Sequence, residues 1–502
     1  MTIRSPRSAV LCLIVAATLV RLGFAWSIGL GVDESYMVAA GRVFSFGYFD
    51  HPPVSWWLSW GAAQVFGEAP LAVRLPFILL SALSTWLMYR LGTEAAGAQA
   101  GFWAAFAFSL SPVLGVTSAT WVLPDGPLDC ALLGAALCLM HALAERDRVW
   151  PSFAWWLGAG ICAGLALLSK YSAMLTIGGA FVFLLTSRAH RRFLARPEPY
   201  VAVLVAFALF SPVVFWNATH GWASFAFQSA RAGAARFRPW MPLATLAGEA
   251  LFILPWIWAP LMVAFVAATR RGPSHWRGWL LCCLGAPPIF LFVLISAWTS
   301  QRVLFHWAAP GYLLLFPLLG GLIVRLLNRG SVATQCVLAG TAVFTVTVLA
   351  VLGVGVRFDL LNPVVALFAP RTDPMTEAVD WSSLRTDLAA RDLLHLPNTV
   401  LAAPTWRESG KIAYGLGPDV VLTCINPDCR QFGFIRPSAG AVGQDVLLIV
   451  PDHVDRVARE MAPLFDRLET LAPISVRYRG RTLKTVDLLL GHHFKQWPPA
   501  AG

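Results

Sequence analysis

The sequence predicts a polytopic α-helical membrane protein that ends in a small α/β domain. Hydrophobic residues make up 57% of the 502 positions and charged residues only 13%, and the mean hydropathy is +0.64. About eleven apolar stretches are long enough, or nearly so, to cross roughly 30 Å of hydrocarbon. From residue 357 onward charge becomes more frequent and the apolar stretches become shorter.

The apolar stretches place the membrane-spanning helices within residues 1–356. The first stretch follows Arg4 and Arg7, and no small-residue cleavage pattern ends it, so we expect a retained helix instead of a cleaved signal. The expected spans lie near residues 8–30, 69–91, 100–118, 128–144, 154–169, 171–187, 200–216, 244–268, 279–297, 310–327 and 333–356.

The distribution of charge predicts the orientation of these helices. Residues 357–502 hold 16 Lys+Arg and 16 Asp+Glu, so the net charge of +11 comes from residues 1–356, which hold 22 basic and 11 acidic residues. The basic residues fall mainly in short alternate loops, as the positive-inside rule describes for cytoplasmic loops. This placement argues against a nucleic-acid partner. An odd number of spans puts the C-terminal region on the outer face.

Residues 31–68 form the first outer loop. Residues 39–44 and 56–60 are expected to be short amphipathic helices in the membrane interface, with Pro52-Pro53 breaking the chain between them. Such a loop would roof a cavity that opens into the membrane.

The C-terminal region, residues 357–502, has the pattern of a small α/β domain. Strands are expected at residues 399–402, 419–422 and 445–450, and an amphipathic helix at 452–470. Residues 474–478 and 482–489 are expected to pair as a hairpin through Arg479-Gly480-Arg481.

Two of the nine cysteines lie in this polar region. Cys424 and Cys429 frame Cys-Ile-Asn-Pro-Asp-Cys, and a local disulfide is expected if the region is extracytoplasmic. A zinc site is less favoured, because no second Cys/His pair has matching spacing. The other seven cysteines are scattered through apolar stretches.

The acidic pair Asp33 and Glu34 is the first candidate for chemistry. Carboxylates beside hydrocarbon are costly and usually functional. Paired carboxylates suit general-base catalysis, in which one carboxylate accepts a proton and the other tunes or orients the first. They also suit the binding of a divalent cation. A solvated helix end is the structural alternative.

Two further acids share this face. Asp50 stands in Phe49-Asp50-His51-Pro52-Pro53, where Asp50 and His51 are candidates to bind a metal or a donor phosphate, or the Asp caps a turn. Asp125, in Leu123-Pro124-Asp125-Gly126-Pro127, is either an acidic wall of the cavity or an N-cap.

Basic residues also occur in the expected outer loops, although the positive-inside rule places most basic residues in cytoplasmic loops. They suit the binding of a lipid phosphate, and attraction to anionic headgroups is the alternative. His220 is a candidate metal ligand, although a lone loop histidine more often is not one. The basic candidates are Lys170, Arg231, Arg236, Arg238 and Arg302.

The order of these motifs resembles a known family. The sequence is similar to membrane glycosyltransferases of the GT-C fold, in particular bacterial glycosyltransferase family 39 and aminoarabinose transferase-like proteins, relatives of the protein O-mannosyltransferases. The resemblance covers about residues 10–320. It rests on Val32-Asp33-Glu34-Ser35-Tyr36, Tyr48-Phe49-Asp50-His51-Pro52-Pro53, Phe66-Gly67-Glu68, Ala72-Val73-Arg74-Leu75-Pro76, Pro124-Asp125, Ser169-Lys170-Tyr171 and Phe215-Trp216-Asn217.

The resemblance implies transfer of a sugar, with inversion, from a polyprenyl-phosphate carrier to an outer-face acceptor: lipid A, another glycan or a protein. It implies that Asp33 is the base and that Glu34 supports it. In aminoarabinose transferases the second motif carries Glu-Lys, and its acid is associated with a metal ion. Here Asp50-His51 keeps the carboxylate and loses the Lys, so Lys170 or the loop arginines are expected to compensate. The implied location is a bacterial inner membrane, with the active site and C-terminal domain on the periplasmic side.

Other functional classes fit the sequence less well. The absence of a Walker motif or Rossmann fingerprint argues against a nucleotide cofactor. A transporter or flippase of lipid-linked saccharides is the main alternative, but no repeated halves are visible and the ionisable groups cluster on one face. A non-catalytic scaffold is the weaker third hypothesis.

Overall fold

The structure is a computed structural model that describes residues 4–145, 149–230, 237–299, 303–361 and 375–496. The chain divides into two compact units, which are described separately. The first comprises Met1–Leu22, Phe46–Ser55 and Arg74–Val348, and the second comprises Gly23–Ser45, Trp56–Val73 and Leu349–Gly502. Parts of the first outer loop belong to the same unit as the C-terminal residues, and the domain boundary expected after residue 356 stays a prediction.

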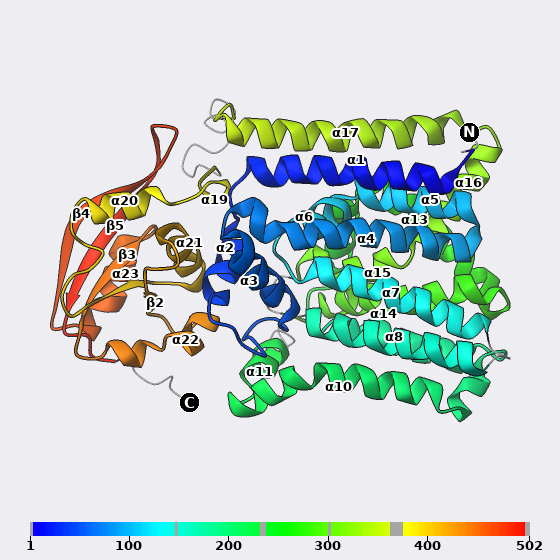
Figure 1. Cartoon of the computed structure of the whole chain (residues 1–502), viewed down its shortest axis with the longest axis horizontal. Coiled ribbons are helices and arrows are strands. Elements are labelled where there is room, and N and C mark those ends of the chain that lie inside the picture. Colours follow the sequence, from blue (N-terminus) through cyan, green and yellow to red (C-terminus); the bar gives the residue numbers. More distant parts are fainter. Residues whose placement is uncertain (1–3, 146–148, 231–236, 300–302, 362–374, 497–502) are drawn as a thin grey trace. The chain divides into compact units, whose positions relative to one another are not determined.

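Helices account for almost all regular structure before the C-terminal region (Figure 1). The longer ones are α1 (Pro6–Ser27), α3 (Val54–Phe66), α4 (Pro70–Ala96), α5 (Ala98–Leu110), α7 (Asp125–Ala144), α8 (Val149–Ser169), α9 (Ala173–Thr186), α10 (Glu198–Thr219), α12 (Met241–Ile253), α13 (Pro255–Arg271), α14 (Trp276–Ile295), α16 (Phe316–Asn328) and α17 (Val332–Arg357). The shorter ones are α2 (Val32–Gly41), α6 (Ser118–Thr120), α11 (Ala223–Ala230) and α15 (Ala309–Leu313).

The helices confirm a multi-span membrane architecture. Within the described ranges, 7 helical segments are long and apolar enough to cross a membrane, or up to 9 if each of two bent pairs is one span. The 41-residue segment Pro255–Ile295 counts once, although it contains both α13 and α14. Two shorter apolar helices, α9 and α12, add to these. The total of about eleven spans stays a prediction.

Three expected spans are interrupted in the structure. The one expected at residues 244–268 is two helices, because Leu254 has a φ of 85° and Pro255 then starts α13 without an N–H to donate. The one at 310–327 is bent by 64° between Phe305–Leu313 and Phe316–Asn328. The one at 100–118 bends by 79°, where Pro112 opens a π-helical turn.

The first outer loop forms two short helices on either side of Pro52-Pro53, as predicted. However, α2 begins at Val32 and not near residue 39. The cause is local: Gly31 is extended, its N–H donates to the Glu34 Oε2 at 3.0 Å, and Asp33 and Glu34 occupy the first turn. Acidic side chains there complement the helix dipole. The acidic pair therefore belongs to a helix start.

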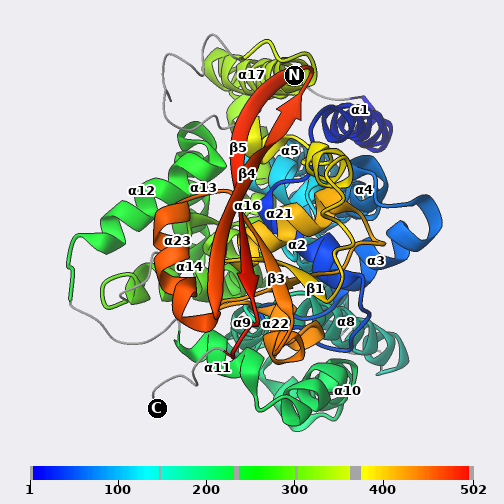
Figure 2. The ribbon, with the colours of Figure 1, turned by 90° about the vertical axis from the view of Figure 1, so that its left-hand side faces the viewer.

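The second unit contains a five-stranded sheet, whose labelled strands can be followed in Figure 2. Its order is β2-β1-β3-β5-β4, with β1 parallel to β2 and β3, and β5 antiparallel to β3 and β4. The strands are β1 (Thr399–Ala403), β2 (Leu422–Cys424), β3 (Asp445–Val450), β4 (Arg467–Tyr478) and β5 (Arg481–His492).

The predicted hairpin is present and longer than expected. Arg479 and Gly480 both have positive φ, at 49° and 80°, which suits a two-residue turn whose twist matches the strands. The predicted helix at 452–470 ends early: α23 (Val454–Met461) is followed by one 3-10 turn, and β4 starts at Arg467. The predicted strand at 419–422 is shifted to β2.

Alternation along β3 separates two apolar layers. Val446 and Leu448 join Val457 and Met461 of α23 in one buried cluster, while Leu447 and Ile449 point to the opposite face. The remaining helices of this unit are α19 (Met375–Ala378), α20 (Ser383–Ala389), α21 (Trp406–Leu416) and α22 (Gln431–Ile435). Packing of α21 against β1, β2 and α2 ties the acidic helix to the sheet.

Candidate active site

Asp33 is an accessible carboxylate in the first turn of α2. Desolvation by the surrounding protein is the largest influence on it and raises the pKa of Asp33 above its ordinary value. The positive charges of Arg407 and Arg430 oppose this rise, while Glu34 and Glu377 add to it. A carboxylate with a raised pKa, open to solvent and flanked by arginines, is suited to accept a proton from a bound hydroxyl.

Glu34 is placed differently from its neighbour. It is only 2% exposed, and its Oε2 accepts the Gly31 N–H at 3.0 Å. This contact fixes the start of α2 and so the direction of Asp33.

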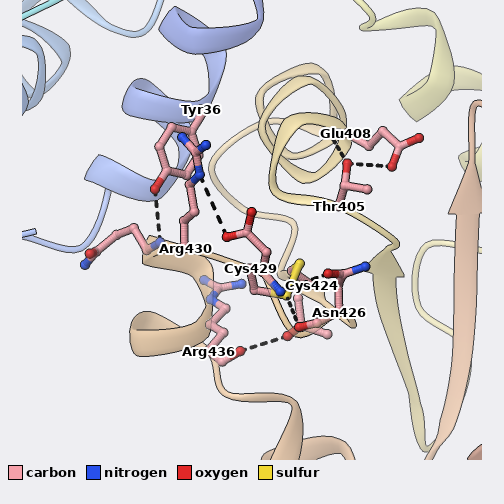
Figure 3. Close-up of a disulfide and its surroundings, with 11 residues drawn as sticks. Tyr36, Thr405, Glu408, Cys424, Asn426, Cys429, Arg430 and Arg436 are labelled. Atoms are coloured by element: carbon pink, nitrogen blue, oxygen red, sulfur yellow. Dashed lines mark hydrogen bonds and ion pairs between the residues drawn. A yellow bond between two sulfur atoms is a disulfide. The ribbon is translucent and has the colours of Figure 1, made fainter. Parts of the chain in front are cut away.

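Tyr36 joins α2 to the C-terminal region of the same unit (Figure 3). Its ring makes edge contacts with Trp56, at 5.4 Å between centroids, and with Trp406, at 5.0 Å. Its hydroxyl oxygen accepts the Gln431 N–H at 3.0 Å. A Cβ on Gly410 would lie 2.7 Å from the Tyr36 Cα, so only glycine permits α21 to approach α2 this closely.

Arg430 is held by the same aromatic group. Its guanidinium carbon lies 3.6 Å from the centroid of the Trp406 ring, a cation–π distance. A disulfide joins Cys424 and Cys429 directly before it, and Figure 3 shows this bridge beside Arg430 and Tyr36. The bridge closes the short loop that presents Arg430.

Arg42, directly after α2, binds both the loop between α3 and α4 and helix α21. Its Nε and Nη2 donate to the two carboxylate oxygens of Glu68 at 2.8 and 2.7 Å, and its Nη1 donates to the Ala413 carbonyl at 2.9 Å. The Tyr414 hydroxyl donates to the Glu68 carbonyl at 2.8 Å. A bidentate Arg–carboxylate pair of this kind fixes geometry as well as charge.

Lys411 is a buried clamp beneath the acidic helix. The side chain is 3% exposed, and its Nζ donates to the carbonyls of Leu30, Glu377 and Val379 at 2.8, 3.1 and 2.9 Å. All three ammonium protons thus have acceptors. The clamp joins α21 to the residue that precedes Gly31, so it also fixes where α2 begins.

The first unit holds the other predicted acids. Asp125 starts α7 and pairs with Lys170, whose Nζ lies 2.9 Å from the Asp125 Oδ1, with both side chains largely buried. His306 and His51 also act electrostatically on this carboxylate. The structure therefore pairs Asp125 with Lys170 and leaves His51 close enough to act on this carboxylate electrostatically.

Asp50 is buried in the same unit, at 2% exposed, and its main-chain oxygen accepts from the Gln228 Nε2 at 2.6 Å. The segment that carries Gln228 is braced by Asn217, whose Oδ1 accepts the N–H groups of Ser224 and Phe225 at 3.1 and 3.2 Å. The Phe-Trp-Asn motif thus shapes the chain next to Asp50.

The remaining basic candidates are less informative. The His220 ring stacks on Trp216 at 4.3 Å, and its Nδ1 engages the Trp216 carbonyl at 2.8 Å, which is a local contact at the end of α10. Arg238 is half-buried, and its N–H donates to the Ala297 carbonyl at 2.8 Å. Arg231, Arg236 and Arg302 lie outside the described residues.

The described residues do not fit a metal centre. Across the described ranges, no group of three or more His, Cys, Asp or Glu side chains is arranged to hold an ion. Asp50 and Asp125 retain the oxygen donors that a divalent cation prefers, but Asp125 is already paired with Lys170.

The sequence did not reveal the residues of the C-terminal region that act on Asp33 or hold α2, namely Trp406, Arg407, Lys411 and Arg430. One local signal was present. Thr405 caps α21 by accepting the Glu408 N–H at 3.3 Å, the Thr-x-x-Glu pattern of a capping box. It predicts the helix but not its partner.

Comparisons with known proteins agree with this architecture. Residues 50–216 match the family model described as Dolichyl-phosphate-mannose-protein mannosyltransferase. A proposed mannosyltransferase of Bacillus subtilis (strain 168), YycA, is 31% identical over 141 residues, which are 28% of this chain and 20% of that protein. The match thus spans about a fifth of the relative's length.

Two crystal structures of ArnT from Cupriavidus metallidurans match nearly the whole chain. The apo state gives a TM-score of 0.62 at 16% identity and covers 97% of this chain and 98% of that one. The structure bound to undecaprenyl phosphate gives 0.62 at 16%, with 95% and 97% covered. Likeness at this identity is a likeness of fold. The chain therefore has the GT-C fold of membrane glycosyltransferases.

Proposed function

We propose that this protein is an inverting membrane glycosyltransferase that takes a sugar from a polyprenyl-phosphate donor. The acceptor is a lipid, glycan or protein on the extracytoplasmic side. Two findings support the donor class: the matched family is described by a dolichyl-phosphate sugar, and one of the ArnT structures contains undecaprenyl phosphate. The proposed location is a bacterial inner membrane, with Asp33 on the periplasmic side.

The environment of Asp33 is the observation that carries the proposal. This carboxylate is accessible, has a raised pKa, and lies among arginines supplied by the C-terminal region. The alternative is that Asp33 only marks a solvated helix end. That alternative does not explain why Lys411, Arg42 and Tyr36 hold α2 in place. A catalytic base does explain these contacts, because it must be held in a fixed position relative to the acceptor hydroxyl.

In the proposed step one proton is transferred, one bond to the anomeric carbon forms and another bond to that carbon breaks. The acceptor O–H gives its proton to the Asp33 carboxylate while its oxygen attacks the anomeric carbon. The bond from that carbon to the donor phosphate oxygen breaks, and the electron pair leaves with the polyprenyl phosphate. Attack opposite the leaving group inverts the anomeric centre. Glu34 keeps Asp33 aimed at the acceptor.

Charge that develops on the departing phosphate must be met by fixed donors. Among the described residues, Lys170, His51 and Arg238 are proposed for this task. Lys170 is already paired with Asp125, so we propose that the phosphate shares this ammonium with Asp125. The arginines 231, 236 and 302 remain proposals of the same kind.

Product formation by the purified protein tests the proposal. The full chain is reconstituted in vesicles with a radiolabelled polyprenyl-phosphate sugar and an envelope extract as acceptor. We expect label in acceptor and stoichiometric release of free polyprenyl phosphate. Movement of intact donor between leaflets without release would instead identify a carrier and overturn the proposal.

A further inference from the structure

A cavity of about 340 Å³ lies between helix ends of the first unit, and its described lining includes none of the candidate active-site residues. It is lined by the end of α4, the last turns of α13, the turn that leads into α14, and α16. Its volume falls in the lower part of the range for ligand pockets, about 300–1,000 Å³.

The polar lining of this cavity is cationic. Arg271, Arg277 and Arg325 line it, together with Ser274 and His275, and no acidic side chain does. No carboxylate in the described ranges forms an ion pair with these three arginines, and Arg271 acts on Arg325 as a like charge. Like charges held close together are unfavourable unless an anion lies between them.

Arg277 has an unused donor. Its guanidinium lies 4.8 Å from the centroid of the Trp276 ring, which fixes the plane of the group. Its Nε is buried and has no hydrogen-bond partner among the described residues. A buried donor without an acceptor is costly, and a phosphate oxygen would satisfy it.

The rest of the wall is built largely from small apolar residues, among them Ala96, Ala264, Ala268 and Gly321. Cationic groups next to a smooth apolar wall match an amphiphile better than a small hydrophilic anion. The positive-inside pattern also assigns these helix ends to the cytoplasmic face, where basic pockets between spanning helices bind anionic headgroups.

We propose that this cavity binds the phosphate of an anionic phospholipid of the cytoplasmic leaflet. Arg271, Arg277 and Arg325 are its ligands, and the first part of an acyl chain follows the apolar wall. A free phosphate ion offers the same oxygens without an acyl chain. The experiment therefore distinguishes a phospholipid from free phosphate. The proposal is independent of the catalytic function.

Native mass spectrometry of the purified full chain tests this site. The protein is delipidated in neutral detergent and titrated with phosphatidylglycerol, phosphatidylcholine or inorganic phosphate. The cavity variant combines Arg271→Gln and Arg325→Gln. The control combines Arg188→Gln and Arg270→Gln, which remove the same charge from residues that do not line the cavity.

We expect wild type and control to bind one phosphatidylglycerol with similar affinity and in preference to phosphatidylcholine. The cavity variant should bind it about tenfold or more weakly, because two headgroup ligands are lost. Equal binding by the cavity variant and the control would overturn the site. Binding of inorganic phosphate but not of phosphatidylglycerol would overturn the lipid as its occupant. Matching thermal unfolding of both variants shows that both are folded.

Discussion

Opposing influences act on the single carboxylate of Asp33. Desolvation raises its pKa, and the positive charges of Arg407 and Arg430 hold that rise back. As the proposed base, Asp33 must be ionised to accept a proton, so the rate should fall as the pH decreases through its raised pKa. The two arginines therefore set how far into the acidic range the enzyme works.

Replacing Arg407 by Gln tests this balance. Loss of the positive charge removes an influence that lowers the pKa of Asp33, so the pKa rises further and the acid limb of the pH–rate profile should move to higher pH. Arg459→Gln, on the exposed face of α23, is the matched control and should leave the limb in place. An unchanged limb in the Arg407 variant would show that another group governs it.

Sequence reasoning identified Asp33 but not the residues around it. An acid beside apolar helices is conspicuous, because its cost is visible in the chain itself. Arg407 and Arg430 come from a neutral, ordinary-looking region far along the chain, and their relation to Asp33 exists only after α21 packs on α2. Glu34 illustrates a second limit. Two adjacent acidic residues look alike in the sequence, which does not show that Asp33 is exposed and Glu34 is buried.

At the scale of elements, α2 is held by contacts of three kinds. Lys411 binds the carbonyl just before it, Arg42 ties it to Glu68, and Tyr36 packs among tryptophans. Helices of ten residues are marginal alone in water, so these contacts determine that α2 forms and where it starts. The acidic pair depends on them for its direction.

Lys411→Met should destabilise the protein by about 2–4 kcal/mol, because the carbonyls of Leu30, Glu377 and Val379 lose the ammonium donor, two of them in buried contacts, while the shape is roughly kept. The thermal unfolding midpoint of the purified chain measures this. The control is Lys495→Met, whose exposed ion pair with Asp466 should be worth less than about 1 kcal/mol. Equal midpoints in the two variants would contradict the clamp.

The elements themselves were largely foreseeable. Apolar length predicted the helices, and alternation with a Gly-containing turn predicted the β4–β5 hairpin. The wrong predictions lie where the local backbone geometry or strand pairing overrides the average hydrophobicity of a stretch. Leu254, with its positive φ, breaks an apolar stretch that looks continuous, and the amphipathic stretch after α23 becomes strand because residues from Arg467 pair with β5.

At the scale of the whole molecule, topology links the two proposals. The positive-inside pattern predicts an outer face for Asp33 and the C-terminal sheet domain, and a cytoplasmic face for the cavity of Arg271 and Arg325. One enzyme would then bind its substrates on one face and an anionic lipid on the other.

Reporter fusions in bacterial cells test this orientation. Alkaline phosphatase, which is active only outside the cytoplasm, should be active when fused after residue 502 and inactive when fused after residue 330. The reverse pattern would place Asp33 on the cytoplasmic side and contradict the proposed donor face.

The most direct test of the central claim is the transfer rate of Asp33→Asn in the reconstituted assay. The amide keeps the shape of the side chain but cannot take the acceptor proton, so transfer should fall by about a hundredfold or more, with expression and unfolding midpoint unchanged. Asp455→Asn, another exposed first-turn aspartate, should transfer at the wild-type rate. A near-normal rate in the Asp33 variant would contradict its role as the base.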